Sequence, residues 1–317
     1  MRRWAIISHE CQSCKFKKIE DWIKSDFDLC RLLVKKQIIQ ANITENAGNS
    51  AIVSLNPGDP THYTTGDALI SCGMGVLYRG HRNSDNLPVT MKIKLRNKIS
   101  NWTYKNGRRI PTEISMMERI NDPANIVKLL DFYVEPEAMI LVCTQQENST
   151  LLKNFISENN RIAEPLARKI FKNIVDSILK CCKLGVSHQN IRSENVIIDQ
   201  NNASASLFNF DCAEDFKESK YIGLPCEFKY APPEVTKHAW YYAQSLQTWQ
   251  LGILLYEMVM GYLPFSRGNF IMNGLIRFYE PVSDQCKNLI KKCLEPVFVH
   301  RPTYREILDH PWMHMES

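Results

Sequence analysis

A polar loop followed by an apolar run is the first feature of this sequence that suggests chemistry: VSHQNIRSENVIID, at positions 186–199. Its polar side chains include His188, Asn190, Arg192 and Asn195. The apolar run is typical of a strand, so the loop before it can position groups around a ligand. A carboxamide has no useful basicity near neutral pH, so Asn190 cannot supply the ~10²–10⁴-fold contribution of a general base.

The sequence NFD at 209–211 follows this loop and adds two oxygen-bearing side chains, those of Asn209 and Asp211. Mg²⁺ prefers carboxylate oxygens, and Asn209 offers only a neutral carbonyl oxygen. Asp211 lies two residues later and would face the same side of an extended chain, although its use would require the loop to shift. A metal ion bound here would have Asn195, Asn209 and Asp211 as possible oxygen ligands, of which the first two are uncharged.

Four residues upstream of the loop could contribute to the same site. Gly73 and Gly75 lie in a turn between two strand-like runs, Lys92 lies on the next such run, and Glu113 lies in the helix-like segment after it. Taken alone, they have ordinary explanations as a tight bend, a solvated lysine and a surface carboxylate. Their order along the chain favours a shared ligand site.

The hydrophobic pattern predicts the elements that would position these residues. Strands are expected at 69–80, 87–95, 126–134 and 138–144, and the second of them alternates apolar with polar residues. Helices are expected at 110–120, with Pro111 in the first turn; at 164–185, ending at Gly185; and at 248–261, which is apolar almost all round and should be buried. A small β-rich half therefore precedes a larger helical half.

Residues 1–59 form an extension in which apolar residues at helix-like spacing precede a linker rich in Asn, Gly and Pro. No stretch reaches the ~18 apolar residues of a membrane span, and the N-terminus lacks a signal-peptide core. The eleven cysteines are therefore expected as reduced thiols of an intracellular protein of the cytoplasm, the nucleus or both. His9, Cys11, Cys14 and Cys30 form only a weak zinc pattern, because the CxxC has no second close pair.

In chain order, these features resemble the protein-kinase signature set of glycine loop, strand lysine, helix glutamate, catalytic loop, metal-binding loop and APE box. Here the elements read CGMGVL, VTMK, Glu113, HQNIRSEN, NFD and APPE, and the resemblance runs from about 63 to 315. RNSDNLPV, WQLGILLYEMVMGYLPF, CLEPVFVHRPT and DHPWM are similar to the Pim serine/threonine kinases.

The resemblance implies an α+β, bilobal protein-kinase-like fold. Its small β-rich N-lobe, with one main helix, would occupy 60–146, and its larger, mainly α-helical C-lobe would occupy 147–317. Residues 1–59 would be partly helical or disordered. Protein partners are implied, namely a kinase, a kinase substrate or a regulator. The net charge of +5 and the lack of a dense basic tract argue against nucleic acid, and a monomer is expected.

The resemblance also implies roles for the upstream residues. Lys92 matches the lysine that pairs with the α- and β-phosphates of ATP, and Glu113 matches its ion-pair partner. Gly73, Gly75 and Thr90 would lie against the nucleotide.

Further positions match the metal site and the scaffold. Asn195 matches the ligand of a second Mg²⁺. Glu234 of APPE and Arg301 of HRPT match the pair that ties the activation segment to the helical lobe. Gln247, in the buried helix with Trp249, stands where many kinases have an aspartate.

The sequence departs from the family at the charged centre. Asn190 replaces the catalytic aspartate and Asn209 replaces the metal-binding aspartate, so two negative charges are lost where metal and nucleotide would meet. Arg192 replaces the loop lysine and keeps its charge but not its compact shape. Together these changes predict lost or severely impaired phosphoryl transfer.

Nucleotide binding is also predicted to be weak. Ile70 and Cys72 replace two of the three loop glycines, which let the backbone approach phosphates closely, and Gly75 alone remains. Thr90 replaces a small alanine and would crowd the adenine. ATP with Mg²⁺ is therefore implied as a weak cofactor pair.

Substrate positions have changed as well. Glu227 replaces the threonine that serine/threonine kinases place beside the substrate. Leu151 and Asn154 replace acidic positions that Pim kinases use for basic peptides, whereas Glu194 keeps a third.

Three hypotheses follow for a chain whose status as an enzyme the sequence leaves open. The first is a Pim-like pseudokinase that acts by binding or regulating partners. The second is an active or weakly active ATP-dependent serine/threonine kinase that uses Lys92, Asn195 and Asp211. The third is a nucleotide-binding switch without phosphoryl transfer.

Overall fold

The computed structural model describes residues 62–72, 75–121, 125–145, 148–265 and 276–315. The expected helix and linker of the N-terminal extension lie outside these residues, and so does Gly73.

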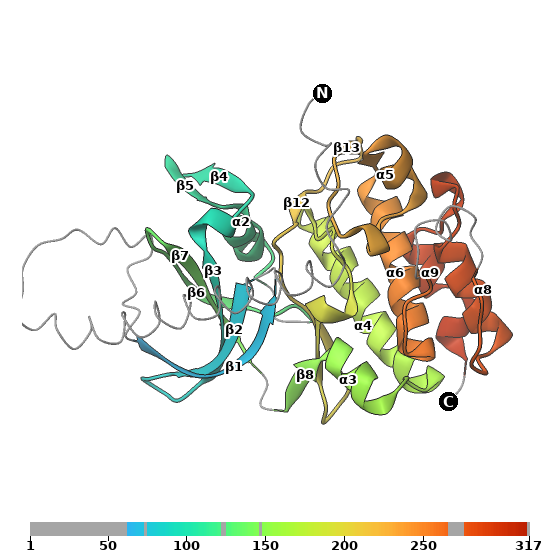
Figure 1. Cartoon of the computed structure of the whole chain (residues 1–317), viewed down its shortest axis with the longest axis horizontal. Coiled ribbons are helices and arrows are strands. Elements are labelled where there is room, and N and C mark those ends of the chain that lie inside the picture. Colours follow the sequence, from blue (N-terminus) through green and yellow to red (C-terminus); the bar gives the residue numbers. More distant parts are fainter. Residues whose placement is uncertain (1–61, 73–74, 122–124, 146–147, 266–275, 316–317) are drawn as a thin grey trace, which may run out of the picture. The chain divides into compact units, whose positions relative to one another are not determined.

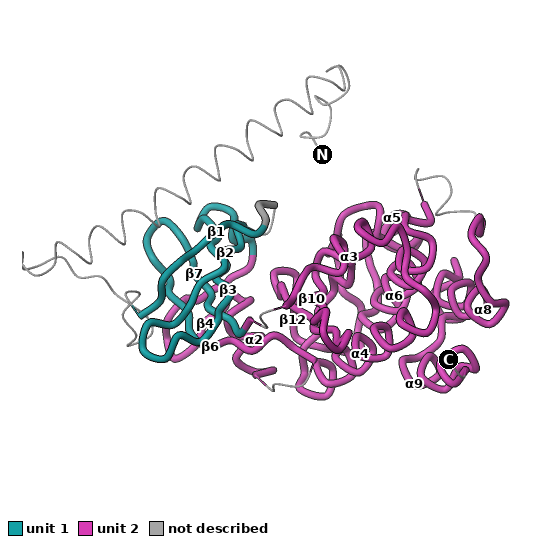
Figure 2. The backbone as a smooth tube through the Cα atoms, turned by 90° about the horizontal axis from the view of Figure 1, so that it is seen from below, with its two compact units in different colours: residues 1–100, 130–144 teal, residues 101–129, 145–317 magenta. Residues whose placement is uncertain are grey.

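The chain divides into two compact units (Figure 2). Unit 1 comprises residues 1–100 and 130–144, and unit 2 comprises residues 101–129 and 145–317. The division into an extension and two lobes at residues 59 and 146 stays a prediction.

Unit 1 is built on a five-stranded sheet with the strand order β1-β2-β3-β7-β6 (Figure 1). The pairs β1–β2, β2–β3 and β3–β7 are antiparallel. The strands are β1 (Tyr63–Cys72), β2 (Gly75–Arg82), β3 (Pro88–Leu95), β6 (Leu129–Val134) and β7 (Ala138–Thr144), with a short 3-10 turn, η2 (Arg96–Lys98), after β3. The strands predicted from the hydrophobic pattern are confirmed, with the run at 69–80 covering the end of β1 and most of β2.

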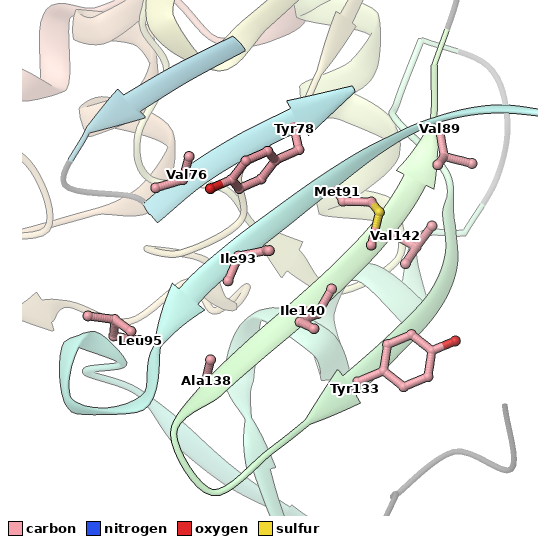
Figure 3. Close-up of a cluster of buried hydrophobic side chains, with 10 residues drawn as sticks. All are labelled: Val76, Tyr78, Val89, Met91, Ile93, Leu95, Tyr133, Ala138, Ile140 and Val142. Atoms are coloured by element: carbon pink, nitrogen blue, oxygen red, sulfur yellow. The ribbon is translucent and has the colours of Figure 1, made fainter. Parts of the chain in front are cut away.

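One face of this sheet carries an apolar core (Figure 3). Val89, Met91 and Ile93 all point from β3 into this core, because alternate side chains of a strand lie on the same face. Thr90 and Lys92 therefore share the opposite face, as the sequence pattern predicts. The remaining core residues are Val76, Tyr78, Leu95, Tyr133, Ala138, Ile140 and Val142.

Gly75 begins β2 in a conformation that only glycine adopts without strain, with φ at +111°. A Cβ atom at this position would lie 2.4 Å from the carbonyl oxygen of Ile93 on the neighbouring strand. The fold of unit 1 therefore accounts for this glycine without a nucleotide.

Unit 2 contains the helices of the described residues and several short strands (Figure 1). Its helices are α2 (Thr112–Arg119), α3 (Leu152–Asn159), α4 (Glu164–Lys183), α5 (Pro233–His238), α6 (Ala243–Met260), α8 (Asp284–Cys293) and α9 (Tyr304–Leu308). Its strands are β4 (Trp102–Lys105), β5 (Arg108–Pro111), β8 (Ser149–Leu151), β9 (Val186–Ser187), β10 (Val196–Asp199), β11 (Ala205–Leu207), β12 (Glu214–Asp215), β13 (Tyr221–Ile222) and β14 (Trp240–Tyr241). Its 3-10 turns are η3 (Ser193–Asn195), η4 (Phe228–Tyr230), η5 (Phe298–His300) and η6 (Pro311–His314).

The predicted long helices are confirmed. Helix α4 ends at Lys183, and Gly185 follows it with φ at +73°, which is the usual place of a C-terminal glycine. Helix α6 is buried on all sides. At Gly252 a Cβ atom would lie 2.8 Å from the Cβ atom of Cys293, so α6 and α8 pack closely there.

The β4–β5 hairpin was not among the predicted elements. Asn106 and Gly107 form its turn with φ values of +50° and +74°, the pairing that a type I′ turn requires. Pro111 ends β5 and directly precedes α2, so it lies one residue before the helix rather than within its first turn. No helix in the described ranges is long and apolar enough to cross a membrane.

Candidate functional site

The polar loop that opened the sequence argument connects β9 to β10 in unit 2. The backbone N–H of Asn190 donates to Nδ1 of His188 at 3.3 Å, so the proton of this imidazole lies on Nε2. Nε2 then donates to the carbonyl oxygen of Phe208 at 3.0 Å. The His188 ring also packs edge-on against Phe210, with 4.6 Å between ring centroids. This buried histidine therefore joins the polar loop to the NFD segment.

Two neutral carboxamides of α6, those of Gln247 and Gln250, hydrogen-bond to the loop and hold it in place. Gln250 of α6 accepts from the N–H of Ile191 and donates to the carbonyl of Gln189, both at 2.9 Å. Gln247 donates to the hydroxyl of Ser187 at 2.9 Å. The polar side chains here are fully buried: Ser187, Gln189, Gln247 and Gln250. The two hydrogen bonds of Gln250 satisfy backbone groups of the loop without using a charged side chain. The sequence pointed to Gln247 but missed Gln250, whose only signal was a polar residue in an otherwise apolar helix.

Asn190 is 8% exposed and contacts a thiol. Its Nδ2 donates to Sγ of Cys212 at 3.7 Å. Its Oδ1 is buried and has no hydrogen-bond partner among the described residues. A neutral amide in this position can donate or accept a hydrogen bond, but it cannot remove a proton from a substrate hydroxyl. Nothing in the sequence pattern pointed to Cys212.

A hydrogen bond joins the two asparagines proposed as metal ligands. Asn195 donates from Nδ2 to the backbone carbonyl of Asn190 at 2.8 Å, and this fixes which way its amide points. Oδ1 of Asn195 therefore faces Asn209 and accepts from its Nδ2 at 2.9 Å. Asn209 adopts a left-handed backbone conformation, with φ at +62°, which asparagine tolerates better than most residues.

This donor set does not fit Mg²⁺. Oδ1 of Asn195 already accepts a hydrogen bond from a group that cannot bind a cation, and Asn209 presents its nitrogen, not its oxygen, toward Asn195. Asp211 is half-buried. Within the described residues no group of three or more His, Cys, Asp or Glu side chains could hold a metal ion. A hydrogen bond between amides thus stands between the two positions that the resemblance assigns to metal ligands.

Arg192 and Glu227 form an ion pair between the polar loop and the segment before α5. The guanidinium donates to Oε1 of Glu227 at 2.5 Å and lies over the ring of Tyr230, 5.4 Å from its centroid. Lys229 approaches the other carboxylate oxygen of Glu227 to 3.2 Å. Partial burial would raise the pKa of Glu227, but the hydrogen bond and charge of Arg192, with the charge of Lys229, outweigh it and lower the pKa.

Two further carboxylates near this loop are already engaged. Glu194 accepts from the hydroxyl of Tyr230 at 3.1 Å and lies 3.7 Å from Nε of Arg192. Glu257 is fully buried in α6 and accepts from Nζ of Lys153 at 2.8 Å. Burial alone would lower the pKa of Lys153, but the hydrogen bond and charge of Glu257, with the charge of Glu194, raise it. Sequence reasoning identified Glu194 and missed the Lys153–Glu257 pair.

The scaffold pair predicted from APPE and HRPT is formed. Arg301 donates from both terminal nitrogens to the two carboxylate oxygens of Glu234, at 2.7 and 2.8 Å. Both side chains are buried, and Arg301 also donates to the backbone carbonyls of Glu295 and Ser245. A two-pronged arginine–carboxylate pair of this kind adds geometric specificity.

The residues proposed for nucleotide binding are divided between the two units. Thr90 and Lys92 lie on β3 in unit 1 and are 8% and 4% exposed. Glu113 lies in the first turn of α2 in unit 2 and is 4% exposed. Ile70 and Cys72 belong to β1, where a glycine loop would otherwise begin. Their roles toward ATP remain predictions.

Comparison with known proteins identifies relatives of one kind. The family described as "Protein kinase domain" matches residues 63–313. Serine/threonine-protein kinase pim-2 of Danio rerio is 32% identical over 265 residues, covering 80% of this chain and 85% of the relative. Serine/threonine-protein kinase prk-2 of Caenorhabditis elegans is 32% identical over 249 residues, covering 77% of this chain and 56% of the relative. The match to Serine/threonine-protein kinase PSK2 of Saccharomyces cerevisiae is 30% over 240 residues, 73% of this chain and 22% of the relative.

Proposed function

The chain belongs to the protein kinase superfamily, with relatives among the Pim kinases, and from this premise we propose that it is a pseudokinase. In this proposal it keeps the kinase fold, does not transfer phosphate, and acts by binding a kinase, a kinase substrate or a regulator. The observation that carries the proposal is the hydrogen bond from Asn209 to Asn195.

The charge at this centre supports the proposal. An enzyme of this superfamily ordinarily uses ATP with Mg²⁺, and the metal neutralises charge that develops on the phosphates. Here Asn190 and Asn209 stand at the two positions where kinases have aspartates. The oxygen of Asn195 that would face a metal accepts an N–H from Asn209 instead. A carboxamide oxygen is a weaker ligand for a hard cation than a carboxylate. The donor set therefore favours a centre that is stable without a metal.

The substrate side of the loop supports the same function. The cation of Arg192 is paired with Glu227, and the carboxylate of Glu257 is paired with Lys153. Glu194 is shared between Tyr230 and Arg192. A basic substrate peptide would have to displace these partners, so we expect little preference for such peptides.

The scaffold is consistent with a role in binding. The Glu234–Arg301 pair, the buried helix α6 and the glutamine contacts to the loop all hold shape and require no ligand. We place the protein inside the cell, in the cytoplasm, the nucleus or both, as a monomer that meets protein partners.

A transfer assay tests the proposal. The full chain is incubated with labelled ATP, a basic peptide, and Mg²⁺ or Mn²⁺, beside a Lys92→Met variant that removes the phosphate-pairing lysine. We expect equal, background-level transfer from both proteins. Transfer that is clearly above background and is lost in Lys92→Met would establish the rival hypothesis of an unorthodox enzyme that uses Asn195 and Asp211.

The third hypothesis, a nucleotide-binding switch, is separated from the pseudokinase proposal by binding. A ligand at ~100 times its dissociation constant stabilises the folded state by about 2.7 kcal/mol. An increase in unfolding temperature with ATP, without any transfer, would favour the switch. We expect no increase at millimolar ATP.

A further inference from the structure

A second surface of unit 2 has features that the catalytic-loop proposal does not use. It lies where β13 pairs with β14, next to α5 at one end of the unit (Figure 1). Ile222 lies directly opposite Trp240 in this pair and is 88% exposed. An isoleucine this exposed on a strand has no role in the core.

Aromatic contacts extend this surface to the turn η5. Phe298 packs edge-on against Trp240 and also contacts Tyr242, with 5.3 and 5.7 Å between ring centroids. Val297 and Val299 flank Phe298 and are 46% and 65% exposed. We call these residues the aromatic surface: Ile222, Trp240, Tyr242, Val297, Phe298 and Val299. Contiguous exposed apolar residues with a polar rim are typical of a binding site.

Basic side chains surround the aromatic surface. The ammonium of Lys220 lies 4.2 Å from the centroid of the Trp240 ring, and the His238 ring stacks on the same tryptophan at 6.0 Å. Lys237 and His300 lie at the ends of α5 and η5, next to the surface in the chain. Within the described part of the chain, none of the four forms an ion pair. The positive charges of Lys220 and Lys237 are therefore available to an acidic ligand.

Acidic residues are few in the same segments. Glu295 accepts from the N–H of Val297 at 3.4 Å, which directs its carboxylate to the backbone. Glu218 is exposed and lies two residues before Lys220. The lysines of the rim, unpaired within the described residues, favour an acidic partner, because a basic partner would meet like charges.

The aromatic surface is held in place by the buried scaffold pair. Arg301, next to His300, donates to Glu234 and to the carbonyls of Glu295 and Ser245. The hydroxyl of Ser245 in turn donates to the carbonyl of Phe298 at 3.4 Å. A surface fixed in this way loses little conformational entropy on binding.

We propose that the aromatic surface binds a short acidic segment of a partner protein that carries a large apolar anchor. The anchor would pack against Ile222, Trp240 and Phe298, and its acidic neighbours would pair with the basic rim. Aromatic residues at the centre of an interface commonly contribute most of its affinity, with charges at the rim setting specificity. The inference rests on the proposed function for its purpose, because it names the partner class of a protein that acts by binding.

Fluorescence anisotropy with the full chain tests this inference. The probe is a labelled peptide in which two tryptophans alternate with glutamates. One control peptide carries lysines in place of the glutamates, and another carries alanines in place of the tryptophans. We expect saturable binding of the acidic aromatic peptide alone, and binding that weakens as salt is added.

Variants locate the binding site. Ile222→Glu is expected to weaken binding about tenfold or more, which corresponds to ~1.4 kcal/mol, without affecting the fold because this side chain is exposed. Lys220→Glu with Lys237→Glu should weaken binding several-fold and reduce its salt dependence. Tyr279→Ser and Lys172→Glu are matched controls, since both side chains are exposed and neither belongs to the aromatic surface or its rim, and they should leave affinity unchanged.

Three results would overturn the inference: no binding of the acidic peptide, equal binding of the basic peptide, or wild-type affinity in Ile222→Glu. Sedimentation of the wild-type chain and Ile222→Glu is a further check. If the wild type is a dimer that this variant dissociates, the surface joins two copies and the proposed partner is wrong. The two proposals can fail separately. Phosphoryl transfer by the wild-type chain would refute the pseudokinase proposal but would not change whether the acidic peptide binds. The Asn190→Asp, Asn209→Asp variant should bind the peptide normally, because neither residue belongs to the aromatic surface.

Discussion

At the scale of single residues, the orientation of one amide decides the chemistry of the loop. Asn195 must present its oxygen to Asn209, because its nitrogen is used by the carbonyl of Asn190. Asn209 can satisfy that oxygen only as a donor. A carboxylate at position 209 would instead place two acceptors against each other, and only a proton or a cation could bridge them.

Replacement of that donor gives the first prediction. Asn209→Asp should lower the free energy of unfolding by about 2 kcal/mol or more at neutral pH, since a buried acceptor loses its donor and gains a charge. Burial should raise the pKa of the new carboxyl above the ordinary ~3.9. The penalty is then small below that pH, where both states are protonated, and it grows as pH rises and the unfolded chain ionises. Urea denaturation across pH measures this.

Metal provides the control for this variant. Mg²⁺ should recover part of the stability of Asn209→Asp and should leave the wild type unchanged. A variant as stable as the wild type at all pH values would show that Asn195 and Asn209 are not paired as described.

The Arg192–Glu227 pair gives a second prediction with a definite pH dependence. The pKa of Glu227 is lowered in the folded state, so the stabilisation is present above the ordinary pKa of glutamate and is lost as pH falls through the folded-state value. Glu227→Gln should therefore lower the free energy of unfolding near pH 7, by at most about 1 kcal/mol because the pair is partly solvated. The difference should vanish in acid.

Denaturation curves at neutral and acidic pH measure this difference. Glu158→Gln is the matched control, since Glu158 is an exposed glutamate of α3. A loss in Glu227→Gln that is equal at both pH values would exclude an ionic contribution.

Residue types along the chain indicated most residues of this site, but not all the side chains that form hydrogen bonds with them. Asn190, Asn195 and Asn209 were grouped through the resemblance of their segments to the catalytic and metal-binding loops of protein kinases. Cys212 and Lys153 carried no such signal. Their contacts depend on tertiary packing between segments that lie 22 and 104 residues apart in the chain.

At the scale of elements, helix α6 is the support on which the loop rests. It is buried on all sides, so its polar residues need internal partners, and Gln250 finds them in the backbone of the loop. These hydrogen bonds hold the backbone of the loop in place. Its support uses amide hydrogen bonds that do not titrate.

The third prediction concerns this support. Gln250→Ala leaves the N–H of Ile191 and the carbonyl of Gln189 buried without partners, at a cost of about 1–3 kcal/mol for each. We expect a correspondingly lower midpoint in urea denaturation. Gln244→Ala, on the half-buried first turn of the same helix, should change stability far less. Equal effects would mean that the loop does not depend on α6.

Element boundaries were predictable where the hydrophobic period was long and regular. Helix α4 and strand β3 have such patterns, and Gly185 marks a helix end by its own chemistry. Helix α6 is apolar on all sides, and its predicted start at 248 lies five residues after its observed start at Ala243. The β4–β5 hairpin was missed although Asn106-Gly107 is a strong turn signal. Its strands are short and mostly exposed, so the alternation that identifies a strand is weak there.

At the scale of the whole molecule, the chain combines a protein kinase fold with an uncharged, hydrogen-bonded pair of asparagines, Asn195 and Asn209. The scaffold pair Glu234–Arg301 joins the first turn of α5 to the residue that follows the turn η5, which carries Phe298. The same pair thus supports both the kinase fold and the aromatic surface proposed for a partner. The order of the motifs indicated the class of protein through the resemblance to protein kinases, but the aromatic surface joins three distant segments and could not be seen in the sequence.

The metal dependence of nucleotide binding tests the central claim that a hydrogen bond between asparagines has replaced the metal site. The unfolding temperature of the full chain is measured with millimolar ATP, with and without Mg²⁺, beside the Asn190→Asp, Asn209→Asp variant. We predict that Mg²⁺ adds nothing to the wild-type value and raises that of the variant. A clear Mg²⁺-dependent increase in the wild type would contradict the account.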